Sequence, residues 1–142
     1  LKLPNDKTNV TYYGYGPYES YSDKHRASWV DRFDTTVDDM FEDYVFPQEN
    51  GSHYNCQYAS VGNLYAKGKK PFSFQASRYS EKELDEKAHN FELVPSDGIY
   101  VALDYKQSGI GSNSCGPRLA EKYQIREEKI EWEISIRFDN GN

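Results

Sequence analysis

Apolar and polar residues alternate along several stretches of this chain, with the two-residue period of a β-strand that buries one face. The clearest case is the stretch 130–138, whose apolar residues are Ile130, Trp132, Ile134, Ile136 and Phe138. Further strands are predicted at residues 9–15, 27–33, 53–61, 72–77 and 98–105. We therefore expect an all-β antiparallel domain that is sandwich-like, with one face of each strand buried.

Two of these stretches allow the buried face to be assigned. In 53–61 the two-residue period predicts one strand face with Tyr54, Cys56 and Tyr58. The opposite face then holds Asn55, Gln57 and Ala59. In 98–105 the shared face holds Ile99, Val101, Leu103 and Tyr105. Cys56 is accordingly expected to be a half-buried strand residue.

Only one helix is predicted. Ser80 and Glu83 form a capping box, in which the serine caps the helix start and the glutamate reaches back. The helix that follows, 81–88, is short and largely charged, so it is expected to lie over a sheet edge. Residues 67–71 are expected to form a basic turn, and Asn50-Gly51 is a favoured type I′ turn pair.

Composition limits the classes of function. The 142 residues suit one domain, 1–142, and the start at Leu1 suggests a cut or processed end of a longer polypeptide. A net charge of -6 argues against a nucleic-acid partner, and no apolar run is long enough to span a membrane. Two cysteines are too few for a disulfide scaffold, which favours a reducing, cytoplasmic location.

The stretch Ser108–Pro117 lies between two predicted strands and holds three glycines, short polar residues and Cys115. Such a loop on a rigid β scaffold is a typical position for binding residues. The alternative is a plain connection whose glycines serve turn geometry alone.

No complete catalytic set is visible. Glu19 and Glu49 are the best candidates for a glycosidase pair, but hydrogen bonds to loop backbone are the favoured role. The histidines His25, His53 and His89 have no metal-ligand spacing, and His89 is expected to end the charged helix. The acidic stretch 34–44 lacks the spacing of a calcium loop, which favours a solvated loop.

Cys115 has no visible base to activate it as a nucleophile, and no serine lies in a Gly-x-Ser-x-Gly turn. From the residues alone, the chain is a binding or supporting domain.

Four stretches resemble a known family. Residues 13–23, Tyr-Gly-Tyr-Gly-Pro-Tyr-Glu-Ser-Tyr-Ser-Asp, are similar to the Gly-x-Gly-Pro-x-Glu-x-Tyr-x-Asp signature in the C-terminal domain of glycoside hydrolase family 2 β-galactosidases. The resemblance continues, in the family's order, through Tyr-Val-Phe-Pro-Gln-Glu-Asn-Gly, Phe-Gln-Ala-Ser-Arg-Tyr-Ser and Gly-Ile-Gly-Ser-Asn-Ser-Cys-Gly-Pro at 44–51, 74–80 and 109–117. We refer to these stretches as motifs one to four.

The resemblance implies a supersandwich fold like that of galactose mutarotases, of which this chain is the later portion. It implies hydrolysis of terminal β-D-galactosides such as lactose, with the catalytic glutamates and the Mg and Na ions on a barrel domain or a separate large chain. This fragment then carries no catalytic residue and no cofactor, and the complete enzyme is expected to be a homo-oligomer.

The resemblance also implies that motif four reaches the active site, so that the substrate-binding residues are Asn113, Ser114 and Cys115. In some members a tryptophan takes the place of Cys115 and packs on the substrate; here that stacking contact is lost. Two alternatives stay open: a free carbohydrate-binding module that uses its tyrosines as sugar platforms, and a sugar epimerase with a histidine pair.

Overall fold

The part of the chain that the structure describes contains seven β-strands and little helix. The computed structural model describes residues 1–111 and 119–139. Its strands are β1 (Lys2–Pro4), β2 (Asn9–Gly16), β3 (Trp29–Thr36), β4 (His53–Val61), β5 (Leu64–Ser77), β6 (Gly98–Asp104) and β7 (Ile134–Phe138). The helical elements are α1 (Glu81–Glu86) and two 3-10 turns, η1 (Asn90–Glu92) and η2 (Glu121–Tyr123).

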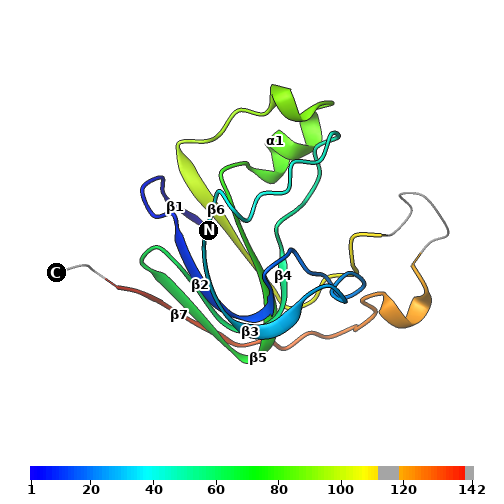
Figure 1. Ribbon diagram of the computed structural model, residues 1–142. Coiled ribbons are helices and arrows are strands. Elements are labelled where there is room, and N and C mark those ends of the chain that lie inside the picture. Colours follow the sequence, from blue (N-terminus) through cyan, green and yellow to red (C-terminus); the bar gives the residue numbers. More distant parts are fainter. Residues whose placement is uncertain (112–118, 140–142) are drawn as a thin grey trace.

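The strands form one antiparallel sheet in the order β1-β6-β5-β4-β2-β3. β7 pairs with β5 from Leu64 to Gly68, and β6 pairs with β5 from Ser73 to Ser77. The sheet curves strongly, and α1 lies beyond one end of it (Figure 1). The all-β, antiparallel prediction with a peripheral helix is therefore confirmed, and the sheet is consistent with one layer of a partial supersandwich.

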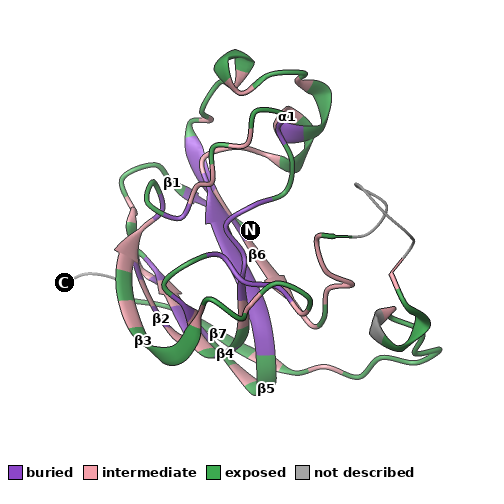
Figure 2. Ribbon diagram, turned by 45° about the vertical axis from the view of Figure 1, so that its right-hand side comes forward, coloured by how far each residue is buried: buried purple, intermediate pink, exposed green. Residues whose placement is uncertain are grey.

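The core lies on one side of the sheet and follows the alternation of β2. Val10 and Tyr12 are buried, whereas Thr11 and Tyr13 on the other side are half-buried. The C-terminal half of β5 is buried on both faces, as the continuous purple stretch in Figure 2 shows. Ile99 and Val101 of β6 join the same core, as their alternation predicts.

The face assignment for β4 is wrong because the strand contains a bulge. From His53 to Cys56, four residues of β4 run beside only three of β5, Phe74 to Phe72. The extra residue is accommodated at Asn55, whose φ is 58°. One added residue turns the side chains that follow to the opposite face. Cys56 is therefore fully buried, and a second register shift between Cys56 and Tyr58 leaves Tyr58 on the outer face with Tyr54.

Two predicted turns have a different form. The stretch 67–71 lies inside β5 as an irregularity, in which Lys67 to Phe72 runs beside only Tyr58 to Cys56. Pairing with β7 continues the strand through Gly68, a contact that local sequence does not reveal. At Asn50-Gly51 only Gly51 has a positive φ, 70°, so a type I′ turn does not form.

The helix begins where predicted and ends earlier. Ser80 accepts a hydrogen bond from the Glu83 N–H at 3.0 Å, which caps α1. The Glu83 carboxylate does not complete the box, because its Oε1 accepts from the Val94 N–H at 2.9 Å. α1 ends at Glu86, and His89 instead precedes η1.

The C-terminal strand is shorter and more exposed than its pattern predicts. β7 begins only at Ile134, and the side chains of Ile136 and Phe138 are 42% and 52% exposed. β7 pairs along one edge with β5, and its apolar side borders a hollow in the described structure. The alternation is real, but nothing in the described residues covers this face.

Candidate functional site

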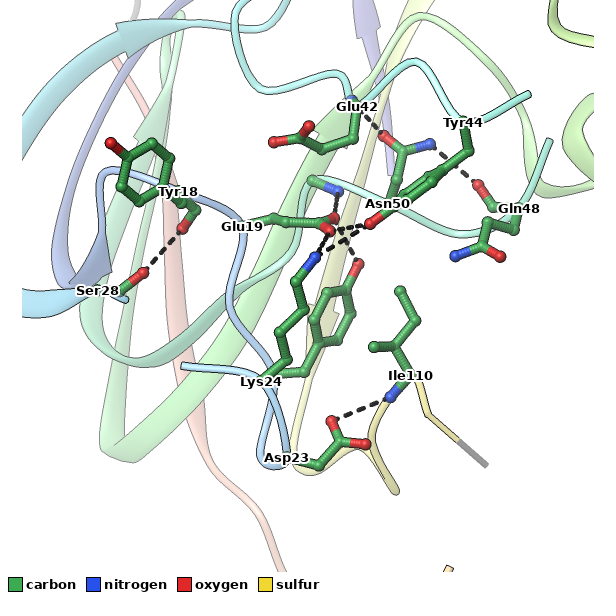
Figure 3. A network of polar contacts seen from close by, with 12 residues as sticks. Tyr18, Glu19, Asp23, Lys24, Ser28, Glu42, Tyr44, Gln48, Asn50 and Ile110 are labelled. Atoms are coloured by element: carbon green, nitrogen blue, oxygen red, sulfur yellow. Dashed lines mark hydrogen bonds and ion pairs between the residues drawn. The ribbon is translucent and has the colours of Figure 1, made fainter. Parts of the chain in front are cut away.

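Motif one runs from the end of β2 into the segment before β3, and this segment is organised around Glu19. The Glu19 side chain is only 2% exposed. Its carboxylate accepts hydrogen bonds from Lys24 Nζ and Tyr44 Oη, and also from Tyr21 Oη at 3.2 Å and the Gly51 N–H at 3.0 Å (Figure 3). Glu19 therefore ties motif one to motif two.

These donors decide the charge of Glu19. Burial by itself would raise the pKa of its carboxyl group, but hydrogen bonds from Lys24, Tyr44 and the Gly51 N–H outweigh burial and lower the pKa below its usual value. The carboxylate is thus ionised at neutral pH and has a donor for each of its lone pairs. Such a group holds structure and has no free oxygen with which to attack a substrate.

Asp23, at the end of motif one, holds the start of motif four. One carboxylate oxygen accepts from the Ile110 N–H at 3.1 Å (Figure 3), and the other accepts from the Gly111 N–H at 3.0 Å. Gly109 has a φ of 91°, and a Cβ placed on it would lie 2.4 Å from the Asp23 Cγ. A glycine is therefore required at position 109 for the loop to approach Asp23.

Motif three lies elsewhere. Arg78 donates to Asp38 through Nε and Nη2, and also to Asn5. Motifs one, two and four thus meet at a single place, while motif three joins the start of the chain to the segment after β3. The meeting point of the three motifs is the base of the loop 108–117, and we define it as the candidate functional site.

Comparison with known proteins agrees with these motifs. The family model described as "Beta galactosidase small chain" matches residues 1–138. The chain belongs to this family. Among curated proteins, it is 47% identical over 137 residues to a beta-galactosidase of Actinobacillus pleuropneumoniae, and 42% identical over 142 residues to one of Staphylococcus xylosus. These alignments cover 96% and 97% of this chain but only 13% and 14% of the two relatives.

The predicted binding residues, Asn113, Ser114 and Cys115, lie outside the described residues. The structure describes the loop residues that precede them, 108–111. Sequence reasoning did not single out Asp23, Lys24 or Tyr44 as site residues. The sequence feature that could have identified them is their position within or next to motifs one and two, because a buried carboxylate such as Glu19 requires hydrogen-bond donors nearby.

The two carboxylates considered as a catalytic pair have separate roles. Glu19 accepts from loop backbone at Gly51, as predicted. Glu49 accepts from the Gln107 side chain at 3.1 Å rather than from backbone. The pKa of the Glu49 carboxyl group is raised, first by partial desolvation and then by repulsion from Asp104 and Glu81. The residue as a whole nevertheless remains exposed.

The histidines have structural contacts. His53 is 2% exposed, its Nδ1 lies 3.1 Å from the Tyr15 carbonyl, and burial lowers its pKa to about 4. His25 Nδ1 lies 2.8 Å from the Tyr21 carbonyl. Within 1–111 and 119–139, no group of three or more histidine, cysteine, aspartate or glutamate residues has the arrangement of a metal site.

Cys56 is a free, buried thiol, and burial raises its pKa. The Sγ lies close to Gly14, on which a Cβ would approach it to 2.3 Å. Cys115 lies outside the described residues. In the described part of the chain, no helix has the length and apolar character needed to cross a bilayer.

Proposed function

We propose that this small-chain domain completes the substrate site of a β-galactosidase that hydrolyses terminal β-D-galactosides such as lactose. In this proposal the loop 108–117 contributes Asn113, Ser114 and Cys115 to the sugar site. The catalytic glutamates and the Mg and Na ions belong to a barrel domain or large chain. Family membership over residues 1–138 supports the reaction class.

The observation that carries the proposal is the anchoring of the loop base. Glu19 joins motif one to motif two, and Asp23 of motif one binds the N–H groups of Ile110 and Gly111 in motif four. A glycine-rich segment loses much entropy on ordering, so fixed attachment at its base reduces the cost of presenting side chains to a ligand. Three motifs separated in sequence are thus used to hold one loop.

The same contacts support the proposal that the domain is inactive alone. A retaining glycosidase needs one carboxylate free to attack and one that is protonated to donate. Glu19 is ionised and saturated by donors, and Glu49 accepts from Gln107. Neither can serve without breaking contacts that hold the loop base.

The two alternatives receive less support. The outer-face tyrosines Tyr13, Tyr58 and Tyr65 stack on one another at 6.3 and 5.9 Å, and Arg137 covers Tyr65 at 4.4 Å. A sugar platform needs exposed ring faces, whereas these faces are turned to their neighbours. A histidine-pair epimerase is also disfavoured, because His53 is buried and neutral.

The test is hydrolysis of nitrophenyl β-galactoside by this chain alone and after mixing with a family β-galactosidase truncated to lack this domain. We expect no turnover by the chain alone and restored turnover on mixing. Turnover by the isolated chain would contradict the proposal, because it would require a catalytic carboxylate pair within these residues. Sugar binding by the chain with no restoration would favour the carbohydrate-binding module.

The finer assignments rest on the same proposal. The partner is the barrel domain or large chain of the enzyme, and the complete enzyme is a homo-oligomer. The free thiol of Cys56 suits a reducing compartment, which supports a cytoplasmic location.

A further inference from the structure

Gln107 lies between β6 and the loop and contacts four separate segments. Its side-chain Nε2 donates to Glu49 Oε1 at 3.1 Å and to Asp104 Oδ2 at 2.9 Å. Its Oε1 accepts from Ser52 Oγ at 3.4 Å, and its backbone carbonyl accepts from Ser22 Oγ at 3.2 Å. One half-buried residue therefore joins motif one, motif two, the start of β4 and the end of β6.

The orientation of the amide follows from its partners. Ionised carboxylates only accept hydrogen bonds, so the group that faces both Glu49 and Asp104 must be the NH₂. The amide oxygen is then left for the Ser52 hydroxyl, which can donate. No other uncharged side chain of this size offers two donors and an acceptor in one plane, so the site is matched to glutamine.

The loop residues that follow Gln107 are bound by the same short segment, Ser22-Asp23, that binds Gln107 itself. Ser22 binds Gln107, and the next residue, Asp23, binds the N–H groups of Ile110 and Gly111. The backbone is thereby attached at positions 107, 110 and 111 to one short segment. That segment is itself fixed by the buried Glu19 carboxylate. The direction in which the chain enters the loop is set by these contacts.

We propose that Gln107 is a positioning residue, which sets substrate affinity by fixing the base of loop 108–117 between Glu49 and Asp104. This inference rests on the proposed function, since it assigns a consequence to the loop's place in the sugar site. Gln107 acts through the loop backbone and does not itself touch substrate.

The charges around Gln107 make a sharp test possible. Burial, followed by repulsion from Glu81 of α1, raises the pKa of Asp104, against the lowering effect of Gln107. The pKa of Glu49 is raised in the same way by burial, Asp104 and Glu81. The neighbouring Lys106 is paired with Glu127. A third carboxylate placed at position 107 would therefore meet like charges and hold a proton more tightly than usual.

The experiment compares steady-state kinetics of the complete enzyme that carries this domain with those of its Gln107→Glu variant. At about pH 7.5 we expect KM for nitrophenyl β-galactoside to rise about tenfold with kcat within about twofold, because two charge-assisted hydrogen bonds become repulsive. At about pH 5.5 KM should return toward the wild-type value, because the introduced carboxyl group donates again once it is protonated. Gln57→Glu makes the same change on the exposed face of β4 and should alter neither value.

A second variant separates positioning from damage to the fold. Adding Glu49→Gln to Gln107→Glu exchanges amide and carboxylate, and should recover at least half of the lost affinity at about pH 7.5. Hydrogen exchange at the Ile110 and Gly111 amides gives a readout that needs no activity. We expect faster exchange in Gln107→Glu and slower exchange again in the double variant.

The outcomes are distinguishable. Unchanged KM and unchanged exchange in Gln107→Glu would overturn the positioning role, as would a KM rise that neither acid nor Glu49→Gln reverses. If exchange responds as expected but KM does not, the loop base is positioned without consequence for substrate, and the proposal also fails. If replacement of residues 112–118 by glycine leaves KM unchanged, the proposed function of the loop fails independently of Gln107.

Discussion

Glu19 illustrates how a carboxylate inside a family motif can be structural. It is buried, it pairs with Lys24, and it accepts from Tyr21, Tyr44 and the Gly51 N–H. Glu19 is buried although Lys24 is half exposed, so removing the charge of Glu19 leaves the buried donors around it without their acceptor. The residue thus contributes by joining two loops, and its contribution depends on its charge.

Replacing Glu19 by glutamine should destabilise the chain by about 2–3 kcal/mol at neutral pH. The folded pKa of Glu19 lies below its usual value, so its stabilising effect is present above about pH 4.5 and is lost as pH falls below this. Urea unfolding as a function of pH checks both points, and the variant should lose less stability on acidification.

Glu86→Gln is the matched control for this change. Its partner Lys82 is 79% exposed, and the pair lies on the surface of α1. Exposed pairs contribute little, so the shift should stay below about 0.5 kcal/mol. Equal effects of the two substitutions would contradict a structural role for the Glu19 network.

Cys115→Trp tests the binding side of the proposed loop at the same scale. An indole adds a stacking surface, which should lower KM about two- to tenfold for galactosides whose leaving groups are aromatic, with less effect on kcat. The measurement is kcat and KM of the complete enzyme for a series of galactosides with different leaving groups. Kinetics unchanged across the series would rule out contact between residue 115 and substrate.

Among the elements, β4 has the largest effect on how side chains are distributed. Its bulge at Asn55 sends Cys56 into the core, where Gly14 leaves room for the sulfur. Tyr54 and Tyr58 then lie on the outer face and stack on Tyr15 and Tyr13 of β2. The tyrosine row on the outer face therefore depends on two irregularities of the pairing, the bulge at Asn55 and the register shift between Cys56 and Tyr58.

Substitutions at Asn55 should follow the left-handed backbone conformation rather than side-chain size. Asn55→Gly should stay within about 0.5 kcal/mol of wild type, whereas Asn55→Val should cost about 1–2 kcal/mol. Residue 55 is exposed, so loss of packing contributes little to either value. Urea unfolding of both variants is the measurement, and a valine variant as stable as the glycine variant would contradict the bulge.

At the scale of the whole molecule, the described part of the sheet leaves an apolar side uncovered. A hollow of about 640 Å³ is lined by residues from the chain start, β6 and the β7 region, including Leu1, Tyr100, Leu103, Trp132 and Ile134. Two polar atoms at its wall, Gln75 Oε1 and Trp132 Nε1, are buried without a hydrogen-bond partner among the described residues. Uncovered apolar surface of this kind favours association.

The isolated chain should therefore self-associate, and Ile136→Lys should weaken the association about tenfold by placing a charge on the apolar face of β7. Sedimentation velocity over a range of concentrations is the measurement. Ser135→Lys adds the same charge on the opposite face of β7 and should leave association unchanged. A wild-type chain that remains monomeric would contradict the expectation.

The sequence by itself determined the class of the fold, most strand positions and the family. Alternation over β6 and the β-branched and aromatic residues of β2 were sufficient because both are local properties, and Ser80 located the start of α1 for the same reason. The four motifs identified the family because they keep their order along the chain.

Only the tertiary structure decided which face of β4 is buried and how the loop base is held. The bulge at Asn55 and the continuation of β5 through Gly68 depend on the neighbouring strands, which sequence periodicity does not contain. Glu19, Asp23 and Gln107 have their roles because partners 25 to 88 residues away are brought within hydrogen-bond distance. Contacts over such separations arise from sheet pairing, and local propensity carries no record of them.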